Sequence, residues 1–293
     1  MSPENIPNIT YETRDSLIEK IKLAGIERCI DPAIGIDTNS RIIELCEDYP
    51  GFVYGAVGLH PKRAAQTDIE NFSLIEELSQ HRSVVAIGET GLDYSYDGHE
   101  ADKSIQQEWF VKQLELADKY RLPLVLHIRD AYDDAANILQ SFSGRLHGGV
   151  CHCFNGGVDE AIFYTQKLGL ALGIGASIFY DEREILREAV RLTPLEYLFL
   201  ETDGPYVKIP YSEGMLSEIP ETLKRDKNYV ALGEYMLVSK KKWKNARNSS
   251  LIIPAIAAEI ASIKGISIGE VERSTTENAE KIFKLKSDQS FIS

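Results

Sequence analysis

The stretch LPLVLHIRDAYDDAANILQSFSGRLHGGVCHCF, residues 122–154, carries the pattern that decides the fold. Its two ends, LPLVLHI and GGVCHCF, are apolar runs, and the segment 131–141 between them repeats apolar residues at helical spacing. Runs that are apolar almost throughout are typical of parallel strands buried on both faces. The stretch therefore predicts a strand–helix–strand unit, with His127 ending the first strand and His152 lying in the second.

The same alternation continues through the rest of the chain. Further strand-like runs lie at 28–34, 52–59, 83–89, 168–175 and 196–202, and further helical patterns at 38–48, 67–80, 108–120, 157–168 and 181–192. Strands that alternate with helices over short connections predict βαβ units with right-handed crossovers. Two architectures fit this pattern, a closed eight-stranded barrel and an open doubly wound sheet.

The positions of the polar residues favour the barrel. Five of them follow or end different strands: His60, Glu89, His127, His152 and Asp203. An active site assembled from many strand ends is typical of a TIM-type (β/α)8 barrel, and the sequence has no glycine-rich phosphate loop after its first strand. We predict one barrel domain over 1–293. Only seven runs are visible, so the first strand is either irregular, at 5–10 around Pro7, or missing.

Composition excludes several classes of protein. The 293 residues include 32 Lys and Arg against 45 Asp and Glu, a net charge of −13, which excludes a generally basic nucleic-acid coat. No apolar run approaches the roughly 20 residues of a membrane helix, and the polar N-terminus lacks the layout of a signal peptide. Four cysteines are too few for a disulfide scaffold. We expect a reduced cytoplasmic protein that has no membrane partner.

The polar residues at the strand ends suggest a metal site. They lie in short motifs: GLHPKR at His60, GETGLDY with Glu89 and Asp93, LHIRDA with His127 and Arg129, CHCF at His152, and ETDGPY with Glu201 and Asp203. Carboxylate and imidazole donors together suit Zn²⁺, Mn²⁺ or Mg²⁺ better than Ca²⁺. Two such ions bridged by a carboxylate would activate a water and hold a phosphate.

Each of these residues also has a purely structural interpretation. A buried histidine is often a hydrogen-bonded core residue, Glu89 would equally pair with an arginine, and Asp203 would equally cap a following helix. The chain has only six histidines, and three of them lie at predicted strand ends. This concentration favours the metal site over the structural interpretations. Cys151 and Cys153 flank His152, which suggests zinc–thiolate ligation, but strand alternation predicts that both point away from His152 and serve in packing. A cysteine–histidine protease has no other support in the sequence.

Taken together, the motifs resemble the TatD family of metal-dependent deoxyribonucleases, barrel enzymes related to the amidohydrolases. The likeness runs from about residue 14 to Phe283 and includes GLHP, AIGETGLDY, LPLVLHIRDA, HCFNG, LETDGPY, the RN pair at 247–248 and the closing ISIGEVERSTTENAEKIF. The closing motif looks like structure that seals the barrel. The resemblance implies cleavage of DNA, from the 3′ end, with one or two divalent ions.

The resemblance also assigns roles to individual residues. It implies that Glu89, His127, His152 and Asp203 bind metal, and that Asp203 orients or deprotonates the attacking water. It places His60 near the scissile phosphate. In the same interpretation His60, Arg129 and Arg247 neutralise phosphate oxygens, and Asp93 orients a ligand from behind.

Three departures from the family pattern stand out. Many members begin with a His-x-His strand, whereas residues 1–15 contain no histidine, and NIT at 8–10 faintly resembles the segment of members that lack the pair. Gly204 replaces the usual Ser or Ala of ETDGPY, and RNSS replaces RNEP. The segment from Tyr206 to Arg247 is longer than usual.

The long segment is basic. Residues 224–247 hold eight Lys and Arg against two acidic residues, with Tyr235 and Trp243 among them. A basic, aromatic loop at the mouth of a barrel suits a nucleic-acid substrate, although a solvated surface loop has the same composition. Two other hypotheses remain open: hydrolysis of an ester or amide, such as that of aminoacyl-tRNA, and a non-catalytic barrel that has lost its first metal position.

Overall fold

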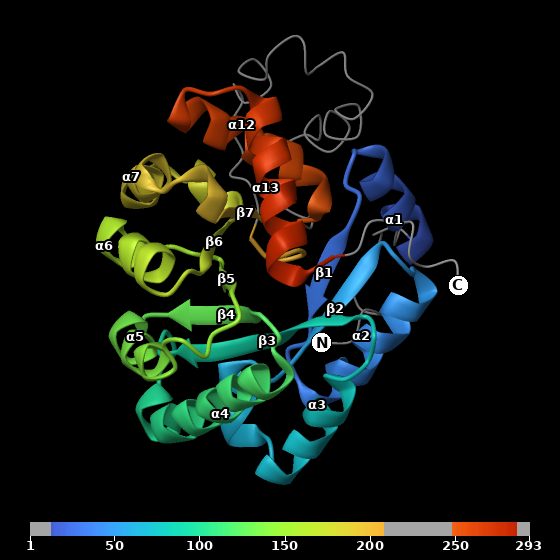
Figure 1. The fold of residues 1–293 in the computed structure, drawn as a ribbon, viewed down its shortest axis with the longest axis vertical. Coiled ribbons are helices and arrows are strands. Elements are labelled where there is room, and N and C mark those ends of the chain that lie inside the picture. The colour runs from blue at the N-terminus through green and yellow to red at the C-terminus, as the bar shows by residue number, and fades with distance from the viewer. Residues whose placement is uncertain (1–12, 208–247, 286–293) are drawn as a thin grey trace.

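The sheet consists of seven parallel strands that are hydrogen-bonded to one another in chain order (Figure 1). The structure is a computed structural model and describes residues 13–207 and 248–285. The strands are β1 (Cys29–Pro32), β2 (Val53–Val57), β3 (Val84–Asp93), β4 (Leu124–Arg129), β5 (Gly149–His152), β6 (Ala171–Ile174) and β7 (Leu198–Leu200). All seven predicted runs are strands, and the α/β barrel class is confirmed. The strand predicted at 5–10 lies outside the described residues.

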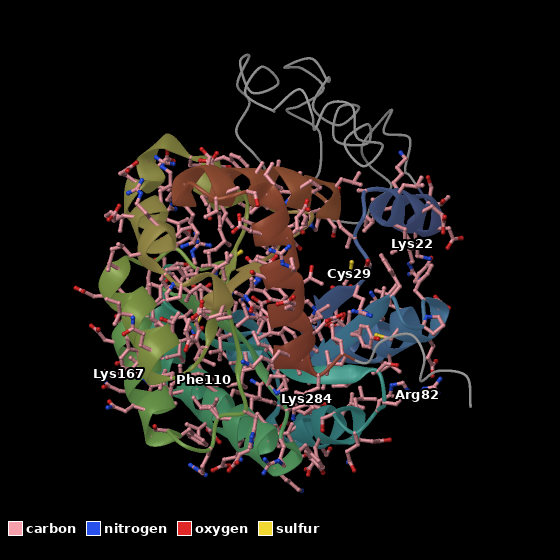
Figure 2. All side chains as sticks on the ribbon, turned by 45° about the horizontal axis from the view of Figure 1, so that its top comes forward. Lys22, Cys29, Arg82, Phe110, Lys167 and Lys284 are labelled. Atoms are coloured by element: carbon pink, nitrogen blue, oxygen red, sulfur yellow. The ribbon has the colours of Figure 1, made fainter. Side chains whose placement is uncertain are left out.

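Helices connect the strands, and most of them cover the outside of the sheet (Figure 1). They are α1 (Arg14–Leu23), α2 (Ile36–Asp48), α3 (Phe72–Leu78), α4 (His99–Tyr120), α5 (Tyr132–Ser141), α6 (Val158–Ile162), α7 (Glu184–Leu192), α12 (Ile253–Lys264) and α13 (Ile268–Phe283). The main core lies between the strands and these helices. Figure 2 shows Phe110 of α4 within this layer, where it is fully buried, and Lys22 and Lys167 at the periphery.

The inner face of the curled sheet holds a second, smaller apolar cluster. Its members include one residue from each of six strands and the end of the last helix: Ile30, Ala56, Ala86, Val125, Val150, Ala171 and Phe283. Successive side chains of a strand point to opposite faces. Two residues beyond Val125 and Val150, the same inner face therefore carries His127 and His152. The apolar cluster therefore lies directly below these polar residues on the inner face of the sheet.

Strand register places the two histidines side by side. In the β4–β5 pair His127 is the direct partner of His152, and in the β3–β4 pair Gly91 is the partner of His127. Gly91 has φ +141°, and a Cβ on it would lie 2.0 Å from the carbonyl oxygen of His127. A glycine is required here because no side chain fits between the strands.

The last helix seals the bottom of the barrel, as the closing motif predicts. Phe283 of α13 packs edge-on against Phe199 of β7, and Glu280 forms an ion pair with Arg28, just before β1. The Asn278 side-chain amide donates to the carbonyls of Leu195 and Leu198, at 2.9 and 2.8 Å. The helix is thus tied to both edge strands of the seven-stranded sheet (Figure 1).

Within the described ranges, no single helix is long and apolar enough to span a membrane. The bent pair Ser250–Lys264 and Ile268–Phe283 meets the criterion by length and composition only. Much of its apolar surface, including Ile256 and Ile260, is buried in the core.

Candidate metal centre

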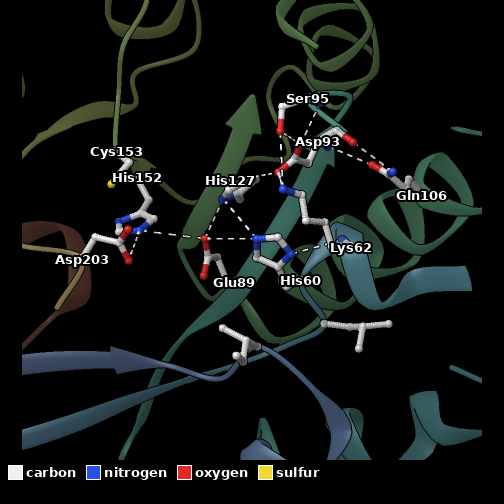
Figure 3. A network of polar contacts seen from close by, with 12 residues as sticks. His60, Lys62, Glu89, Asp93, Ser95, Gln106, His127, His152, Cys153 and Asp203 are labelled. Carbon is white, nitrogen blue, oxygen red and sulfur yellow. Dashed lines mark hydrogen bonds and ion pairs between the residues drawn. The ribbon is translucent and has the colours of Figure 1, made fainter. Parts of the chain in front are cut away.

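Five of the residues selected from the sequence meet at the carboxyl ends of the strands (Figure 3). Oε1 of Glu89 lies 2.8 Å from Nδ1 of His127, 3.8 Å from Nε2 of His60 and 3.9 Å from Nε2 of His152. Nε2 of His152 lies 3.6 Å from Oδ1 of Asp203. Glu89 is therefore the centre of the cluster, and Asp203 is its outermost carboxylate.

Burial decreases from Glu89 toward Asp203. The Glu89 side chain is 8% exposed, those of His152, His60 and His127 are 12–16% exposed, and that of Asp203 is 31% exposed. The cluster is thus buried at Glu89 and open to solvent at Asp203, and we call the solvent-exposed side at Asp203 the open rim. A ligand that enters from solvent meets Asp203 before it meets Glu89.

His127 is held between two carboxylates. Its Nδ1 faces Glu89, and its Nε2 lies 2.9 Å from Oδ2 of Asp93. Burial alone would lower the pKa of His127, but the hydrogen bonds to Asp93 and Glu89 outweigh it and raise that pKa. Because β3 continues as far as Asp93, four residues beyond Glu89, a single strand supplies both carboxylates. Asp93 thus contacts the His127 nitrogen that faces away from Glu89, and its role in orienting a ligand stays a prediction.

Asp93 is itself fixed by several donors. Its Oδ1 accepts hydrogen bonds from the backbone N–H and the hydroxyl of Ser95, at 2.9 and 2.6 Å. Its Oδ2 lies 3.1 Å from Nζ of Lys62. Burial would raise the pKa of Asp93, but these bonds and the one to His127 hold it far below its usual range. Lys62 of GLHPKR was not singled out from the sequence, where it looks like an ordinary surface lysine.

His152 has a carboxylate partner that the sequence reasoning left without a role. Oε2 of Glu201 lies 2.6 Å from Nδ1 of His152, and Oε1 accepts the backbone N–H of Cys153 at 2.7 Å. The signal was its position in ETDGPY, directly after β7 and two residues before Asp203. Gly173 of β6 leaves the space: a Cβ there would lie 2.3 Å from Oε2 of Glu201.

The ring of His60 is oriented by the backbone of the residue two positions further on. Its Nδ1 accepts the N–H of Lys62 at 3.1 Å, so Nε2 faces Glu89 and His127. Two buried amides hold the backbone just before it. Asn39 exchanges two hydrogen bonds with Gly58, and Gln113 exchanges two with Leu59. Because β2 ends at Val57, the backbone groups of Gly58 and Leu59 lie beyond the strand, and these two side-chain amides supply their hydrogen bonds.

The charges at the centre of the cluster stabilise one another. Burial would raise the pKa of Glu89, but the hydrogen bond with His127 and the charges of His152 and His127 lower it to about 2. Glu89 is therefore ionised at neutral pH. Burial, and then the charge of His127, lower the pKa of His60 to about 4, so His60 offers a neutral ring.

The packing role predicted for Cys153 is wrong, whereas that of Cys151 is confirmed. Cys151 is 3% exposed within the main core. β5 ends at His152, and Cys153 then adopts φ +48°, so alternation stops and its side chain turns toward His152 and Asp203 (Figure 3). Burial and the charge of Glu201 raise the pKa of the Cys153 thiol. A nucleophilic thiolate is disfavoured there, contrary to a cysteine protease.

The donor set fits divalent cations. Two atoms that each lie about 2.0–2.2 Å from one ion are at most about 4.4 Å apart, and the 3.6–3.9 Å separations around Glu89 and His152 meet that limit. Two three-residue groups have converging donor atoms: His60, Asp93 and His127, and His152, Cys153 and Asp203. Oε1 of Glu89 lies close to members of both groups, His127 and His60 on one side and His152 on the other.

The other predicted substrate residues are at the rim or outside the described chain. Arg129 ends β4 with an exposed side chain on the same face as His127. The whole basic segment 224–247, Arg247 included, lies outside the described residues. Asn248 belongs to the RN pair at 247–248 but had no predicted role; its amide donates to the carbonyls of Thr202 and Val207 and so fixes the loop that carries Asp203. The predicted roles of all these residues remain predictions.

An α/β barrel with carboxylates and imidazoles converging at its strand ends defines the class of metal-dependent hydrolases. The family model described as TatD related DNase matches residues 5–284. The chain therefore belongs to the TatD family, as its motifs indicate.

Relatives and solved structures agree with this assignment. The chain is 31% identical over 276 residues to the uncharacterized metal-dependent hydrolase YabD of Bacillus subtilis strain 168, covering 94% of both chains. It is 31% identical over 273 residues to the 3′-5′ ssDNA/RNA exonuclease TatD of Rahnella sp. strain Y9602, covering 93% of this chain and 92% of that one. The crystal structure of YjjV, a TatD homologue from Escherichia coli K12, superposes with a TM-score of 0.76 at 25% identity, covering 93% of this chain and 92% of that one.

Proposed function

We propose that this hydrolase is a deoxyribonuclease that removes nucleotides from the 3′ end of single-stranded DNA. The observation that carries the proposal is the position of Glu89 between His127 and His152, with Asp203 at the open rim. The names of relatives such as the Rahnella exonuclease support a nucleic-acid substrate. Glu89, His127, His152 and Asp203 would hold one or two divalent ions.

The cation supplies positive charge that offsets a phosphate and lowers the pKa of a nearby water. The chain's own residues do the rest. Asp203, the most exposed carboxylate of the cluster, receives the proton of the attacking water at a carboxylate oxygen. Glu89, Asp93 and Glu201 keep the two imidazole rings fixed, so no reorganisation is needed when the substrate arrives.

Positive and neutral donors near the rim suit the phosphate backbone. The Lys62 side chain is 41% exposed, and its ammonium group lies 3.1 Å from Asp93 at the edge of the cluster. Arg129 is exposed at the end of β4, one inward-facing position above His127. We assign His60, Lys62 and Arg129 to the non-bridging phosphate oxygens, because charge-assisted bonds to phosphate are strong and directional. Arg247 joins them in this proposal from the basic segment.

The test uses the full chain after metal removal with a chelator. A single-stranded DNA labelled at its 5′ end is incubated with Mg²⁺, Mn²⁺ or Zn²⁺ restored, and shortening from the 3′ end is followed on a gel. We expect stepwise shortening that needs a metal, is lost in Asp203→Asn and is kept in Asp159→Asn, an exposed carboxylate on α6. Absence of shortening with every metal, or equal shortening in Asp203→Asn, would overturn the proposal. Turnover of aminoacyl-tRNA instead would favour the ester hydrolase.

A further inference from the structure

Cys153 places a sulfur atom among the donors of the metal centre. One ligand atom each of His152, Cys153 and Asp203 lie within 4.8 Å of one another (Figure 3). The sulfur therefore belongs to a converging set with an imidazole nitrogen and a carboxylate oxygen. The other converging group, His60, Asp93 and His127, has nitrogen and oxygen donors only.

The backbone around Cys153 is fixed in the orientation that turns the thiol inward. Its φ of +48° is in the left-handed region, which non-glycine residues adopt rarely. The N–H of Cys153 donates to Glu201, the same carboxylate that holds the ring of His152. Glu201 thus orients two neighbouring donor residues at once. Cys151, two residues earlier, faces the opposite side of β5 and is buried in apolar core.

We propose that the Cys153 sulfur is a metal ligand, together with His152 and Asp203, and that it makes this half of the centre selective for thiophilic ions such as Zn²⁺ and Co²⁺ over Mg²⁺. The proposal rests on the proposed metal centre and adds a ligand to it. A nitrogen, sulfur and oxygen donor set suits zinc, whereas Mg²⁺ takes oxygen ligands almost exclusively. The thiol proton is released to solvent when the metal–sulfur bond forms.

The sulfur ligand has an optical signature that does not depend on catalysis. Metal-free protein is titrated with Co²⁺, and its visible bands and its sulfur-to-cobalt charge-transfer band in the near ultraviolet are recorded. We expect both in the wild-type chain and in Cys151→Ser, the matched control. In Cys153→Ser the charge-transfer band should be lost while the visible bands remain. The affinity for Zn²⁺ should fall by at least about 10–100-fold, the loss typical of an outer-shell partner, and that for Mg²⁺ should not change.

A persistent charge-transfer band in Cys153→Ser, or its absence from wild-type protein, would overturn the ligand assignment. DNA cleavage does not enter this readout. Loss of nuclease activity with an intact band would therefore reject the proposed function and keep the ligand, whereas cleavage without the band would do the reverse.

A second measurement needs no variant. The wild-type protein is treated with iodoacetamide with and without Zn²⁺, and each cysteine is followed by peptide mass spectrometry. Cys153 should be protected by Zn²⁺ and unprotected by Mg²⁺. Cys29, an equally half-buried thiol on β1, should label at the same rate in all conditions. Labelling of Cys153 that ignores Zn²⁺ would contradict the assignment.

Discussion

Oε2 of Glu201 lies 2.6 Å from Nδ1 of His152, while the other oxygen of the same carboxylate accepts the backbone N–H of Cys153. When a cation is bound, this contact would keep the ring proton of His152 on Nδ1 and leave Nε2, which faces Glu89 and Asp203, free to bind the cation. Asp93 would do the same for His127 from the opposite side of the cluster. The side chains of these two carboxylates, Glu201 and Asp93, are 9% and 1% exposed.

Glu201→Gln tests the first of these contacts. A neutral amide holds the Nδ1 proton less firmly, so we expect divalent-metal affinity to fall by about 10–100-fold. Affinity is measured by calorimetry, and the protonated nitrogen of His152 is identified by ¹⁵N NMR. The same substitution at Glu182, an exposed residue, is the control and should leave affinity unchanged. Unaltered affinity in Glu201→Gln would show that the contact is only structural.

Gly173→Ala should reproduce that loss through sterics. The added Cβ would lie 2.3 Å from Oε2 of Glu201, so the carboxylate must move away from His152. We expect weaker metal binding from Gly173→Ala alone, and little further loss when it is added to Glu201→Ala. Gly269→Ala, whose Cβ would meet no atom within 4 Å, is the matched control. Additive losses in the double variant would refute the shared mechanism.

His60 should make stability depend on pH in a defined window. Its pKa is about 4 in the folded chain against an ordinary value of 6.5, because of burial and the charge of His127. The unfolded chain therefore binds the proton first, and stability due to His60 is complete above pH 6.5 and lost as pH falls toward 4. The loss is on the order of 3 kcal/mol at most.

Urea unfolding of chelator-treated protein between pH 7 and pH 4 measures this effect. The stability difference between wild type and His60→Gln should change across that window, in the direction of a relative gain for the variant at low pH. His81→Gln, at a histidine outside the cluster that pairs with Glu47, serves as reference. A difference that stays constant with pH would argue against a depressed pKa at His60.

Asn278→Ala should destabilise the barrel without touching the metal centre. The substitution removes two hydrogen bonds and leaves the carbonyls of Leu195 and Leu198 without that partner, at a cost of about 2–4 kcal/mol. Urea unfolding measures the cost, and Glu277→Ala, exposed on the same helix, is the control. Metal affinity below the unfolding transition should be that of wild type. A cost below about 1 kcal/mol would mean that α13 is held by its apolar contacts instead.

Much of the centre could be predicted from local pattern. Apolar runs mark the buried strands, and a polar residue at the end of such a run stands out because the interior tolerates few of them. His60, Glu89, His127, His152 and Asp203 were found in this way, and the structure brings them together. Parallel strands end at one edge of a sheet, which is why positions far apart in the chain could be expected to meet.

Other features could not be predicted from the sequence, because they depend on contacts between distant residues and on the exact residue at which a strand ends. Lys62 and Asn248 look like surface residues until their partners, Asp93 and the loop at Asp203, are placed beside them. The predicted orientation of the Cys153 side chain was wrong because side chains alternate only within a strand, and β5 ends one residue before Cys153.

The sequence by itself determined the alternating strands and helices, the chemical types of the donors and the edge at which they gather, since periodicity and burial are local properties of a chain. Only the tertiary structure decided that Glu201 supports His152 and that Cys153 turns inward. Those contacts follow from inter-strand register and a left-handed residue after β5, which are set by packing between segments distant in sequence.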